Sequence, residues 1–262
     1  MNAGETSEAP IADVPLFTRH TLGAIRRGEL PPEGALLLVD KPAGWTSFDV
    51  VAKSRNLLGV RKIGHTGTLD PMATGLLILC LGKATKLADL LQAEEKEYTG
   101  TIVFGATTPT DDADSEPNAH FPTDHLTLES ITHQASRFLG TSMQRAPIYS
   151  ARKMNGTRLY TFARRGEEVE IPEKPVTIQR FDILPPALPA SGSPSTAVRF
   201  VVVCSKGTYI RALARDLGKA LGSGAHLTEL RRTRSGRFLV DNAVTIPELI
   251  EAMGRGQDSS AL

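Results

Sequence analysis

Strand-like and helix-like segments follow one another along this chain without the regular alternation that builds a parallel βαβ sheet. GLLILCLG (75–82) is apolar throughout, as expected of a fully buried strand, whereas residues 96–106 alternate at the period of a half-exposed strand. Residues 46–59 instead place apolar side chains at helical spacing, between a Thr or Ser N-cap and a final glycine. The pattern therefore predicts an α+β fold with a mixed, mainly antiparallel sheet and flanking helices.

Other segments continue this pattern. Strands are expected at 35–41, 176–184, 197–204 and on both sides of Ser235–Gly236. Helices are expected at 83–92, 207–222 and 245–253, the last after a Thr245–Glu248 capping box. Residues 127–140 predict an amphipathic helix whose inward face carries Leu128, Ile131, Phe138 and Leu139.

The composition is that of a globular protein without an excess of either charge. The 262 residues are 40% hydrophobic and 23% charged, and 30 Lys and Arg against 29 Asp and Glu leave a formal charge of +1. A nucleic-acid surface would therefore need an uneven placement of cations. Cys80 and Cys204 lie far apart in apolar runs, which favours buried thiols over a disulfide framework or a zinc site.

The domain organisation is predicted to be simple. Residues 1–33 carry four prolines and are expected to form a flexible N-terminal extension, with order beginning at residue 35. Residues 34–262 are expected to form one catalytic domain. No stretch approaches the ~20 apolar residues of a membrane span, and the first residues lack the apolar core of a signal peptide. We therefore expect no membrane association and a cytoplasmic location.

The loop IGHTGTLDPMATGLL (63–77) carries more polar groups than a turn requires. Pro71 pushes Asp70 towards an extended conformation, so the carboxylate is held on a stiff stem, and the glycines allow close approach of neighbouring backbone. A lone aspartate in such a loop most often bonds nearby amides as a turn residue. A reactive carboxylate is the other reading, and its partners decide between the two.

Three residues are candidate partners, two of them elsewhere in the chain and one in the loop itself, and each has a structural alternative. Arg211, one turn into the 207–222 helix, is either a solvated surface residue or a cation that keeps Asp70 ionised. Tyr98 is either a core tyrosine or a ring that stacks on a nucleobase. His65 is either a turn residue or a ring that wedges into an opened base stack.

Two basic runs predict a nucleic-acid partner. RAPIYSARKMNGTRLYTFARR (145–165) has no acidic residue and includes Arg152, Lys153 and Arg158 among several aromatic side chains. Residues 206–237 hold eight Lys and Arg against two acidic residues. Solvated faces usually mix signs, so these runs favour a phosphate-binding surface, and the interleaved aromatics suit unstacked RNA bases.

Metal and nucleotide motifs are absent from the sequence. The acidic loop DDADSE (111–116) is followed by proline where a calcium loop of this type needs glycine. There is also no Walker-type loop and no dinucleotide fingerprint. We therefore expect chemistry without a metal or another cofactor.

Five blocks resemble the TruB-type tRNA pseudouridine synthases in order and spacing, over residues 36–244. They are LLLVDKPAGWTS, GHTGTLDPMATGLL, KEYTGTIVFGATTPTDDADS, SARKMNGTRLYTFARRG and CSKGTYIRALARDLG. The resemblance implies a pseudouridine synthase fold with a central RNA-binding cleft. It also implies isomerisation of one uridine in the tRNA T-loop, position 55, without a cofactor.

The resemblance assigns roles by position. Asp70 matches the catalytic aspartate, Arg211 the arginine paired with it, and Tyr98 the tyrosine packed against the target base. His65 matches the histidine that takes the place of the flipped base. The remaining matched positions are RNA-binding or pocket-lining ones: Lys41, Tyr209, Leu230, Arg152, Lys153 and Arg158. Residues 143–172 match a loop that clamps RNA.

One departure and two rival functions remain. Many family members continue into a C-terminal RNA-binding domain of PUA type, and none is expected here; we expect a monomer whose partner is the T-arm of tRNA. A non-catalytic RNA-binding protein is one rival, although pure RNA binding has no use for Asp70. A metal-dependent nuclease or phosphatase is the other, but its ligand spacing is unconvincing. The sequence leaves open whether Asp70 acts as a nucleophile or as a base on the sugar.

Overall fold

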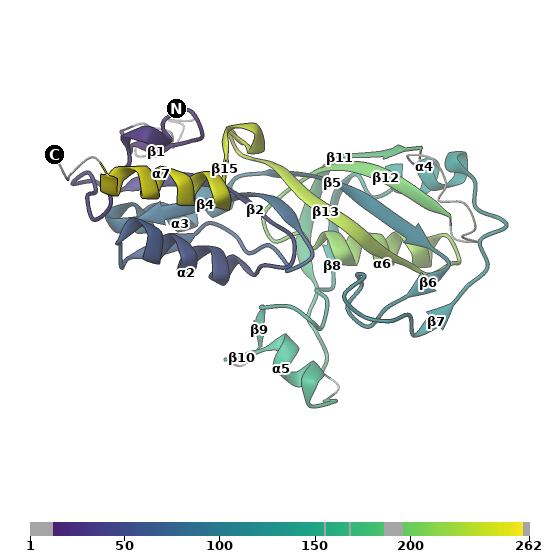
Figure 1. The fold of residues 1–262 in the computed structure, drawn as a ribbon. Coiled ribbons are helices and arrows are strands. Elements are labelled where there is room, and N and C mark those ends of the chain that lie inside the picture. Colours follow the sequence, from purple (N-terminus) through teal and green to yellow (C-terminus); the bar gives the residue numbers. More distant parts are fainter. Residues whose placement is uncertain (1–12, 155, 168, 186–195, 259–262) are drawn as a thin grey trace, which may run out of the picture. The chain divides into compact units, whose positions relative to one another are not determined.

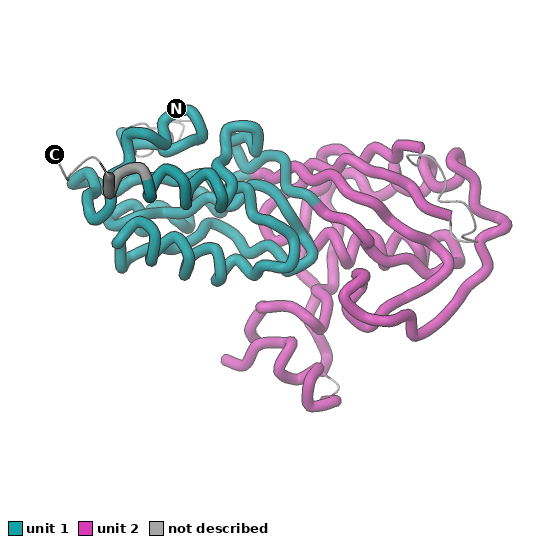
Figure 2. Tube along the Cα trace, viewed as in Figure 1, with its two compact units in different colours: residues 1–94, 231–262 teal, residues 95–230 magenta. Residues whose placement is uncertain are grey.

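The computed structural model describes residues 13–154, 156–167, 169–185 and 196–258. The chain divides into two compact units, which Figure 2 colours separately. Unit 1 comprises residues 1–94 and 231–262, and unit 2 comprises residues 95–230. Strand β13 (Ala225–Ser235) contributes its first residues to unit 2 and its last residues to unit 1.

Unit 1 is an α+β unit whose central strands are buried on both faces (Figure 1). In chain order its elements are β1 (Leu16–Phe17), η1 (Leu22–Ala24), β2 (Ala35–Lys41), α2 (Ser47–Leu58), β3 (Ile63–His65), β4 (Thr74–Leu81), η2 (Gly82–Leu87), α3 (Ala88–Ala93), the end of β13, β14 (Phe238–Leu239), η3 (Val240–Asn242), β15 (Val244–Thr245) and α7 (Ile246–Asp258). The strand order is β1-β2-β4-β13, with β3 paired to β4, β14 to β13 and β15 to β2.

Sequence signals place α2 and β4 as expected. Thr46 caps α2 in a reciprocal box with Asp49, and Gly59 ends the helix in the left-handed conformation. Val50 and Leu58 of α2 pack in one cluster with alternate residues of β2 and β4, including Leu37 and Leu79. The other face of these strands forms a second cluster with α3 and β14. The predicted 83–92 helix is a 3₁₀ segment that leads into the short α3.

Ordered structure begins earlier than predicted. β1 pairs in parallel with β2, and Leu22 and Ile25 are buried in the same cluster as α2. These apolar side chains fasten residues 16–25 to unit 1 despite the prolines around them. The expectation of a flexible extension is therefore wrong for this part, and residues 1–12 lie outside the described residues.

Unit 2 is built on a mainly antiparallel sheet with the order β13-β5-β12-β11-β8. In chain order its elements are β5 (Lys96–Phe104), β6 (Ala106–Thr107), β7 (Ala119–His120), α4 (Leu128–Ser136), β8 (Gly140–Gln144), β9 (Lys153–Met154), β10 (Thr157–Arg158), α5 (Leu159–Arg164), β11 (Lys174–Leu184), β12 (Ala197–Cys204), α6 (Ile210–Ala220) and the start of β13.

Helix α4 is shorter than predicted, and its inward face differs. The helix ends at Ser136 and buries Ile131 and Ala135. Leu128 in its first turn and Leu139 beyond its end are exposed. Since α4 ends at Ser136 with Arg137 as its C-cap, the helical period assumed for Phe138 and Leu139 no longer applies.

Residues 143–172, called the clamp segment here, have a small core of their own. Ala146, Leu159 and Ile171 are buried together. Two short strands, β9 and β10, pair with each other beside α5. Figure 1 shows α5, β9 and β10 lying together as a lobe of unit 2. This segment has weak periodicity because its core is made from scattered single residues.

Candidate active site

The loop that carries Asp70 is fastened on several sides within unit 1. Ser47 Oγ accepts a hydrogen bond from Leu69 N at 2.9 Å and donates to Leu69 O at 3.2 Å. Asp70 O accepts from Ala73 N at 3.1 Å, which closes the turn over the Asp-Pro pair. Pro71 O accepts from Gly44 N at 2.8 Å. Asp70 itself is half-buried. These bonds fix the backbone on both sides of one carboxylate.

Lys41, which the resemblance assigns to the RNA-binding or pocket-lining positions, is fully buried. Its side chain is 0% exposed. The ammonium Nζ donates to Pro42 O at 2.9 Å, Trp45 O at 2.6 Å and Pro71 O at 3.3 Å. A buried ammonium needs such partners because desolvation of an unpaired charge is costly. Lys41 therefore ties the 42–45 turn to the residue that follows Asp70.

We expect Lys41→Met to destabilise the protein by about 3 kcal/mol, because the variant leaves buried carbonyls without their charged donor. Since Pro71 O is one of these carbonyls, turnover should fall with stability. Urea denaturation and a turnover assay measure the two effects. The matched control is Lys53→Met, at a half-buried lysine of α2, and it should change stability by no more than ~0.5 kcal/mol. Equal stability of the two variants would contradict this role.

Arg232 supports the other side of the same loop. Its guanidinium is buried and donates from Nε to Leu76 O at 2.7 Å and from Nη2 to Gly67 O at 3.2 Å. A Cβ at Gly75 would lie 2.3 Å from Arg232 O, and Gly75 has φ +99°, so only glycine fits where β4 meets β13. His65 Nδ1 accepts from Gly67 N at 3.3 Å. Burial lowers the pKa of the His65 imidazole, and the positive charge of Arg232 lowers it further.

Tyr98, Tyr209 and Leu230 lie in unit 2. Tyr98 is buried on β5, opposite Val202 of β12. Leu230 is buried near the point where β13 leaves the unit. Tyr209 is half-buried at the N-cap of α6, where its backbone N donates to Gln144 Oε1 at 2.8 Å and its O accepts from Gln144 Nε2 at 3.1 Å. Gln144 thus fixes the start of the helix that carries Arg211.

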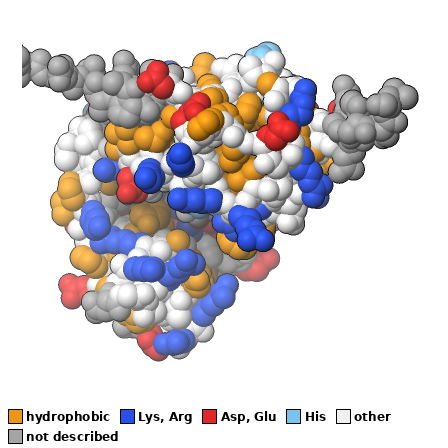
Figure 3. All heavy atoms as spheres, turned by 90° about the vertical axis from the view of Figure 1, so that its left-hand side faces the viewer, with side chains coloured by type: hydrophobic (Ala, Val, Ile, Leu, Met, Phe, Trp, Pro, Cys, Tyr) orange, Lys and Arg blue, Asp and Glu red, His pale blue; other side chains and the backbone are white. Residues whose placement is uncertain are grey.

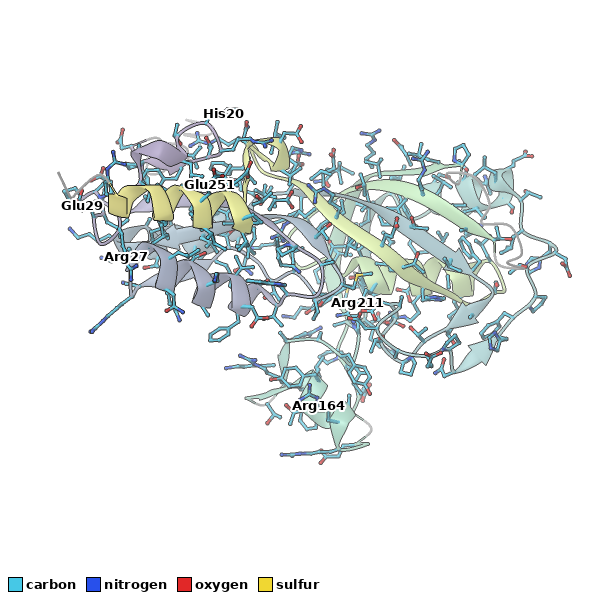
Figure 4. The ribbon with its side chains drawn as sticks, in the orientation of Figure 1. His20, Arg27, Glu29, Arg164, Arg211 and Glu251 are labelled. Carbon is cyan, nitrogen blue, oxygen red and sulfur yellow. The ribbon has the colours of Figure 1, made fainter. Side chains whose placement is uncertain are left out.

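Arg211 is buried, at 4% exposure, which excludes the solvated surface residue that was one of its two sequence alternatives. Nη1 donates to Thr110 O at 2.7 Å and Nη2 to Tyr149 O at 2.9 Å. Nη1 also lies 3.4 Å from Oδ2 of Asp112, a carboxylate that is itself buried. Figure 4 labels Arg211 on α6. The acidic loop and the clamp segment therefore both hold this guanidinium in place.

A second ion pair lies one turn along α6. Arg215 donates to Asp111 Oδ2 at 3.0 Å, to Asp216 Oδ1 at 2.9 Å and to the backbone O of Arg145 at 3.0 Å. Asp111 has φ +59°, in the left-handed region that residues other than glycine seldom adopt. Burial raises the pKa of the Asp111 carboxyl despite the neighbouring Arg215 and Arg211 cations. The acidic loop thus presents two consecutive carboxylates to two arginines one helical turn apart.

The clamp segment places its cations on the outside of its small core. Lys153 and Arg158 are exposed, while Arg152 is half-buried and donates to Pro172 O at 2.9 Å. Arg158 donates to Tyr160 Oη at 3.2 Å, and the guanidinium carbons of Arg158 and Arg164 lie 5.8 and 5.3 Å from the Tyr160 ring centroid. Arg158 and Arg164 therefore lie against an aromatic ring, with Lys153 exposed nearby on the same segment.

The predicted residues fall into two groups. Lys41, His65 and Asp70 lie in unit 1, and the others lie in unit 2: Tyr98, Arg152, Lys153, Arg158, Tyr209, Arg211 and Leu230. Sequence reasoning missed Asp112, Gln144 and Arg232. For Asp112 a signal was available. The acid pair at 111–112 and the arginines Arg211 and Arg215, four residues apart in one helix, suggest paired charges.

Two kinds of feature are missing from the described residues. No group of three or more His, Cys, Asp and Glu side chains is arranged to hold a metal ion in this part of the chain. No helix in the described ranges combines the length and apolar character needed to cross a bilayer.

The chain is similar to proteins of one family along most of its length. Residues 55–210 match the TruB family pseudouridylate synthase (N terminal domain), and residues 211–262 match the tRNA pseudouridylate synthase B C-terminal domain. The chain is 49% identical over 228 residues to the tRNA pseudouridine synthase B of Flavobacterium johnsoniae, covering 84% of this chain and 96% of that protein. It is 50% identical over 218 residues to the same-named protein of Bacteroides thetaiotaomicron, covering 81% and 90% of the two chains.

Solved structures with the same fold come from Cbf5 complexes. A chain of a Cbf5-Nop10-Gar1 complex matches with a TM-score of 0.63 and 26% identity, covering 94% of this chain and 69% of that one. A chain of the archaeal box H/ACA sRNP Nop10-Cbf5 complex matches with a TM-score of 0.61 and 25% identity, covering 90% of this chain. The match spans 64% of that archaeal chain.

These matches confirm the predicted fold, an α+β pseudouridine synthase fold with a mixed sheet. The chain belongs to the TruB family of pseudouridylate synthases.

Proposed function

We propose that this protein isomerises uridine to pseudouridine at position 55 in the T-loop of tRNA. Its membership of the TruB family, whose relatives are named tRNA pseudouridine synthase B, supports uridine isomerisation in tRNA. The observation that carries the proposal is the Asp70 loop, which sits in the family's GHTGTLDPMATGLL block and is fastened by Ser47, Lys41 and Arg232. A protein that only binds RNA would have no need for a carboxylate on so firmly held a backbone.

The reaction exchanges one bond to the ribose for another. The bond from uracil N1 to C1′ breaks, the detached base turns, and a bond from C5 to C1′ forms while C5 loses a proton and N1 gains one. Reactant and product are isomers, so the balance requires no oxidant, reductant or co-substrate. Asp70 acts either as the nucleophile or as the base that removes a sugar proton. Extruding the uridine from its stack costs a few kcal/mol, and a loop nucleotide is already partly unstacked.

The other predicted site residues support this carboxylate in the proposal. Arg211 is the arginine that the family pattern pairs with the aspartate, and its buried contacts hold the cation at one position. Tyr98 supports the detached uracil with its ring. His65 fills the place of the flipped base as a neutral ring, in keeping with its lowered pKa.

The finer description of the partner is also part of the proposal. The T-arm is the part of tRNA that the clamp segment and the Asp70 loop engage. A monomer suffices because every proposed site residue belongs to one chain. The cytoplasm is the proposed location, in keeping with Cys80 and Cys204, which are buried and form no disulfide with each other. Burial raises the pKa of Cys80 to about 12, so this thiol stays protonated and unreactive.

The test is incubation of the purified protein with unmodified tRNA, followed by mapping of pseudouridine at single-nucleotide resolution. We expect modification at position 55 alone, and no modification of a tRNA whose position 55 is cytidine. Binding without any pseudouridine would favour the non-catalytic RNA-binding rival. Modification confined to another position would overturn the T-loop assignment while leaving the isomerase intact.

Neutralising the clamp segment is expected to weaken tRNA binding. The variant is Arg152→Gln/Lys153→Gln/Arg158→Gln. It makes fewer phosphate contacts, so its binding to tRNA releases fewer counterions, and its affinity at 0.15 M salt should fall at least about tenfold. The slope of log affinity against log salt should become shallower by about 2 to 3. The matched control is Arg137→Gln/Arg180→Gln/Arg199→Gln, which removes three exposed cations elsewhere in unit 2. If both variants bind equally well, the RNA surface lies outside the clamp segment.

A further inference from the structure

One end of unit 1 carries an accumulation of cations that the proposed site does not use. Three segments, 26–33, 59–62 and 82–89, contribute six exposed Lys and Arg side chains against three acidic residues. We call this set the basic end, and its members are Arg26, Arg27, Arg61, Lys62, Lys83 and Lys86. Figure 3 views the molecule from the left-hand side of Figure 1 and shows several Lys and Arg side chains on this face, with acidic and hydrophobic side chains between them.

Backbone contacts bring the three segments together. Gly28 N donates to Leu58 O at 2.8 Å, and a Cβ at Gly59 would lie 3.3 Å from Cγ of Arg27. Gly82 N donates to Lys62 O, also at 2.8 Å. A Cβ at Gly34 would lie 2.9 Å from the backbone N of Lys83. The six cations therefore share one surface although they come from separate parts of the chain.

These cations are not used to hold the fold together. Among the described residues, no ion pair involves any member of the basic end, whereas Arg19 pairs with Glu248 and Arg231 with Asp40. Arg26 donates only to the carbonyls of its own turn, Gly23 O and Ile25 O. The C-terminal end of α2 attracts cations, but Arg55 already occupies its last turn. Like charges on one surface repel each other, so a polyanionic partner is the simplest use for them.

The basic end is connected to the Asp70 loop by two strands of unit 1. β3 starts directly after Lys62 and ends at His65, three residues or about 10 Å away. β4 begins four residues after Asp70 and runs for seven steps, about 23 Å, to Leu81 beside the basic end. A duplex carries one phosphate charge per ~1.7 Å of axis, so this path corresponds to about a dozen phosphates. An RNA bound at Asp70 is long enough to reach the basic end.

We propose that the basic end binds the phosphate backbone of the substrate tRNA outside the T-loop, as a second RNA contact separate from the clamp segment. This inference rests on the proposed function, because it takes tRNA to be the substrate. The contact reads charge and not sequence, since phosphate contacts position a nucleic acid without reading its bases. It acts on binding, and it leaves the chemical step at Asp70 unchanged.

The experiment compares two charge-matched variants of the full chain. The test variant is Arg27→Gln/Arg61→Gln/Lys62→Gln/Lys83→Gln, and the control is Arg137→Gln/Lys174→Gln/Arg180→Gln/Arg199→Gln in unit 2, outside both basic runs of the sequence. All eight side chains are exposed, so both variants should unfold at the temperature of the wild type. Affinity for unmodified tRNA is measured from 50 to 200 mM salt, and turnover is measured at saturating tRNA.

We expect the test variant to lose at least about tenfold in affinity at 0.15 M salt, with a salt dependence shallower by about 2 to 4 in slope. Its turnover at saturation should stay within about twofold of the wild type, and the control variant should match the wild type in both measurements. Equal affinity and slope for the two variants, with an active wild type, would overturn the inference alone. A wild type that binds tRNA but forms no pseudouridine would instead overturn the proposed function, whatever the variants do.

Discussion

Asp70→Asn is expected to abolish pseudouridine formation while tRNA binding is kept. The amide has the shape of the carboxylate, so the hydrogen bonds that hold Leu69 and Pro71 should survive. The amide lacks the negative charge needed by a nucleophile or base, and we expect turnover to fall at least about a thousandfold, or ~4 kcal/mol. Affinity for tRNA should be unchanged or slightly higher, because a negative charge near a polyanion has been removed. Single-turnover assays and filter binding measure the two effects.

The control for this experiment is Asp241→Asn, which removes an exposed carboxylate of unit 1 outside the proposed site. It should have the turnover of the wild type. Turnover by the Asp70→Asn variant within tenfold of the wild type would disprove the catalytic assignment. The loop would then be a structural turn, which is the alternative that the sequence leaves open for an isolated aspartate.

Local sequence signals predicted the parts of this fold that are decided locally. Helix α2 is bounded by Thr46 and Gly59, which satisfy backbone groups within one turn of the helix ends. Strand β4 needs only an apolar run that is buried on both faces. The position of Asp70 before a proline and a buried strand was also visible, and the family blocks led us to predict a catalytic role for it. In these cases the deciding contacts lie within a few residues or follow from hydrophobicity alone.

Burial of charged side chains could not be predicted in this way. For Arg211, which lies off the apolar stripe of α6, the sequence left a solvated residue and a cation for Asp70 as alternatives. It did not indicate that Thr110 O and Tyr149 O bind the guanidinium from 101 and 62 residues away. Likewise, nothing in the sequence indicated that the Lys41 ammonium is enclosed by the carbonyls of a turn and of Pro71. Hydrophobic periodicity identifies the apolar face of a helix or strand. It gives no information about a distant loop that covers the polar face. The packed segment at 16–25 was missed for a related reason, because its few apolar residues form no period.

Replacing Arg211 is expected to cause a large loss of stability together with the loss of activity. In Arg211→Met the buried carboxylate of Asp112 loses the guanidinium that lies 3.4 Å away, and two backbone carbonyls lose a charged donor. Removing one partner of a buried ion pair typically costs about 3–5 kcal/mol. For a protein of this size that corresponds to a fall in Tm of roughly 10 °C, which differential scanning calorimetry measures.

The double variant Arg211→Met/Asp112→Asn separates the structural role of Arg211 from its role in the reaction. The amide introduced by Asp112→Asn carries no charge, and its oxygen can still accept from Thr110 Oγ1 and from Asp114 N, as the carboxylate does. We therefore expect most of the lost stability to return, because the uncompensated buried charge is gone. Pseudouridine formation should stay as low as in Arg211→Met, since neither change restores a cation at position 211. If activity returned together with Tm, Arg211 would serve only to neutralise Asp112, and its proposed role toward Asp70 would be wrong.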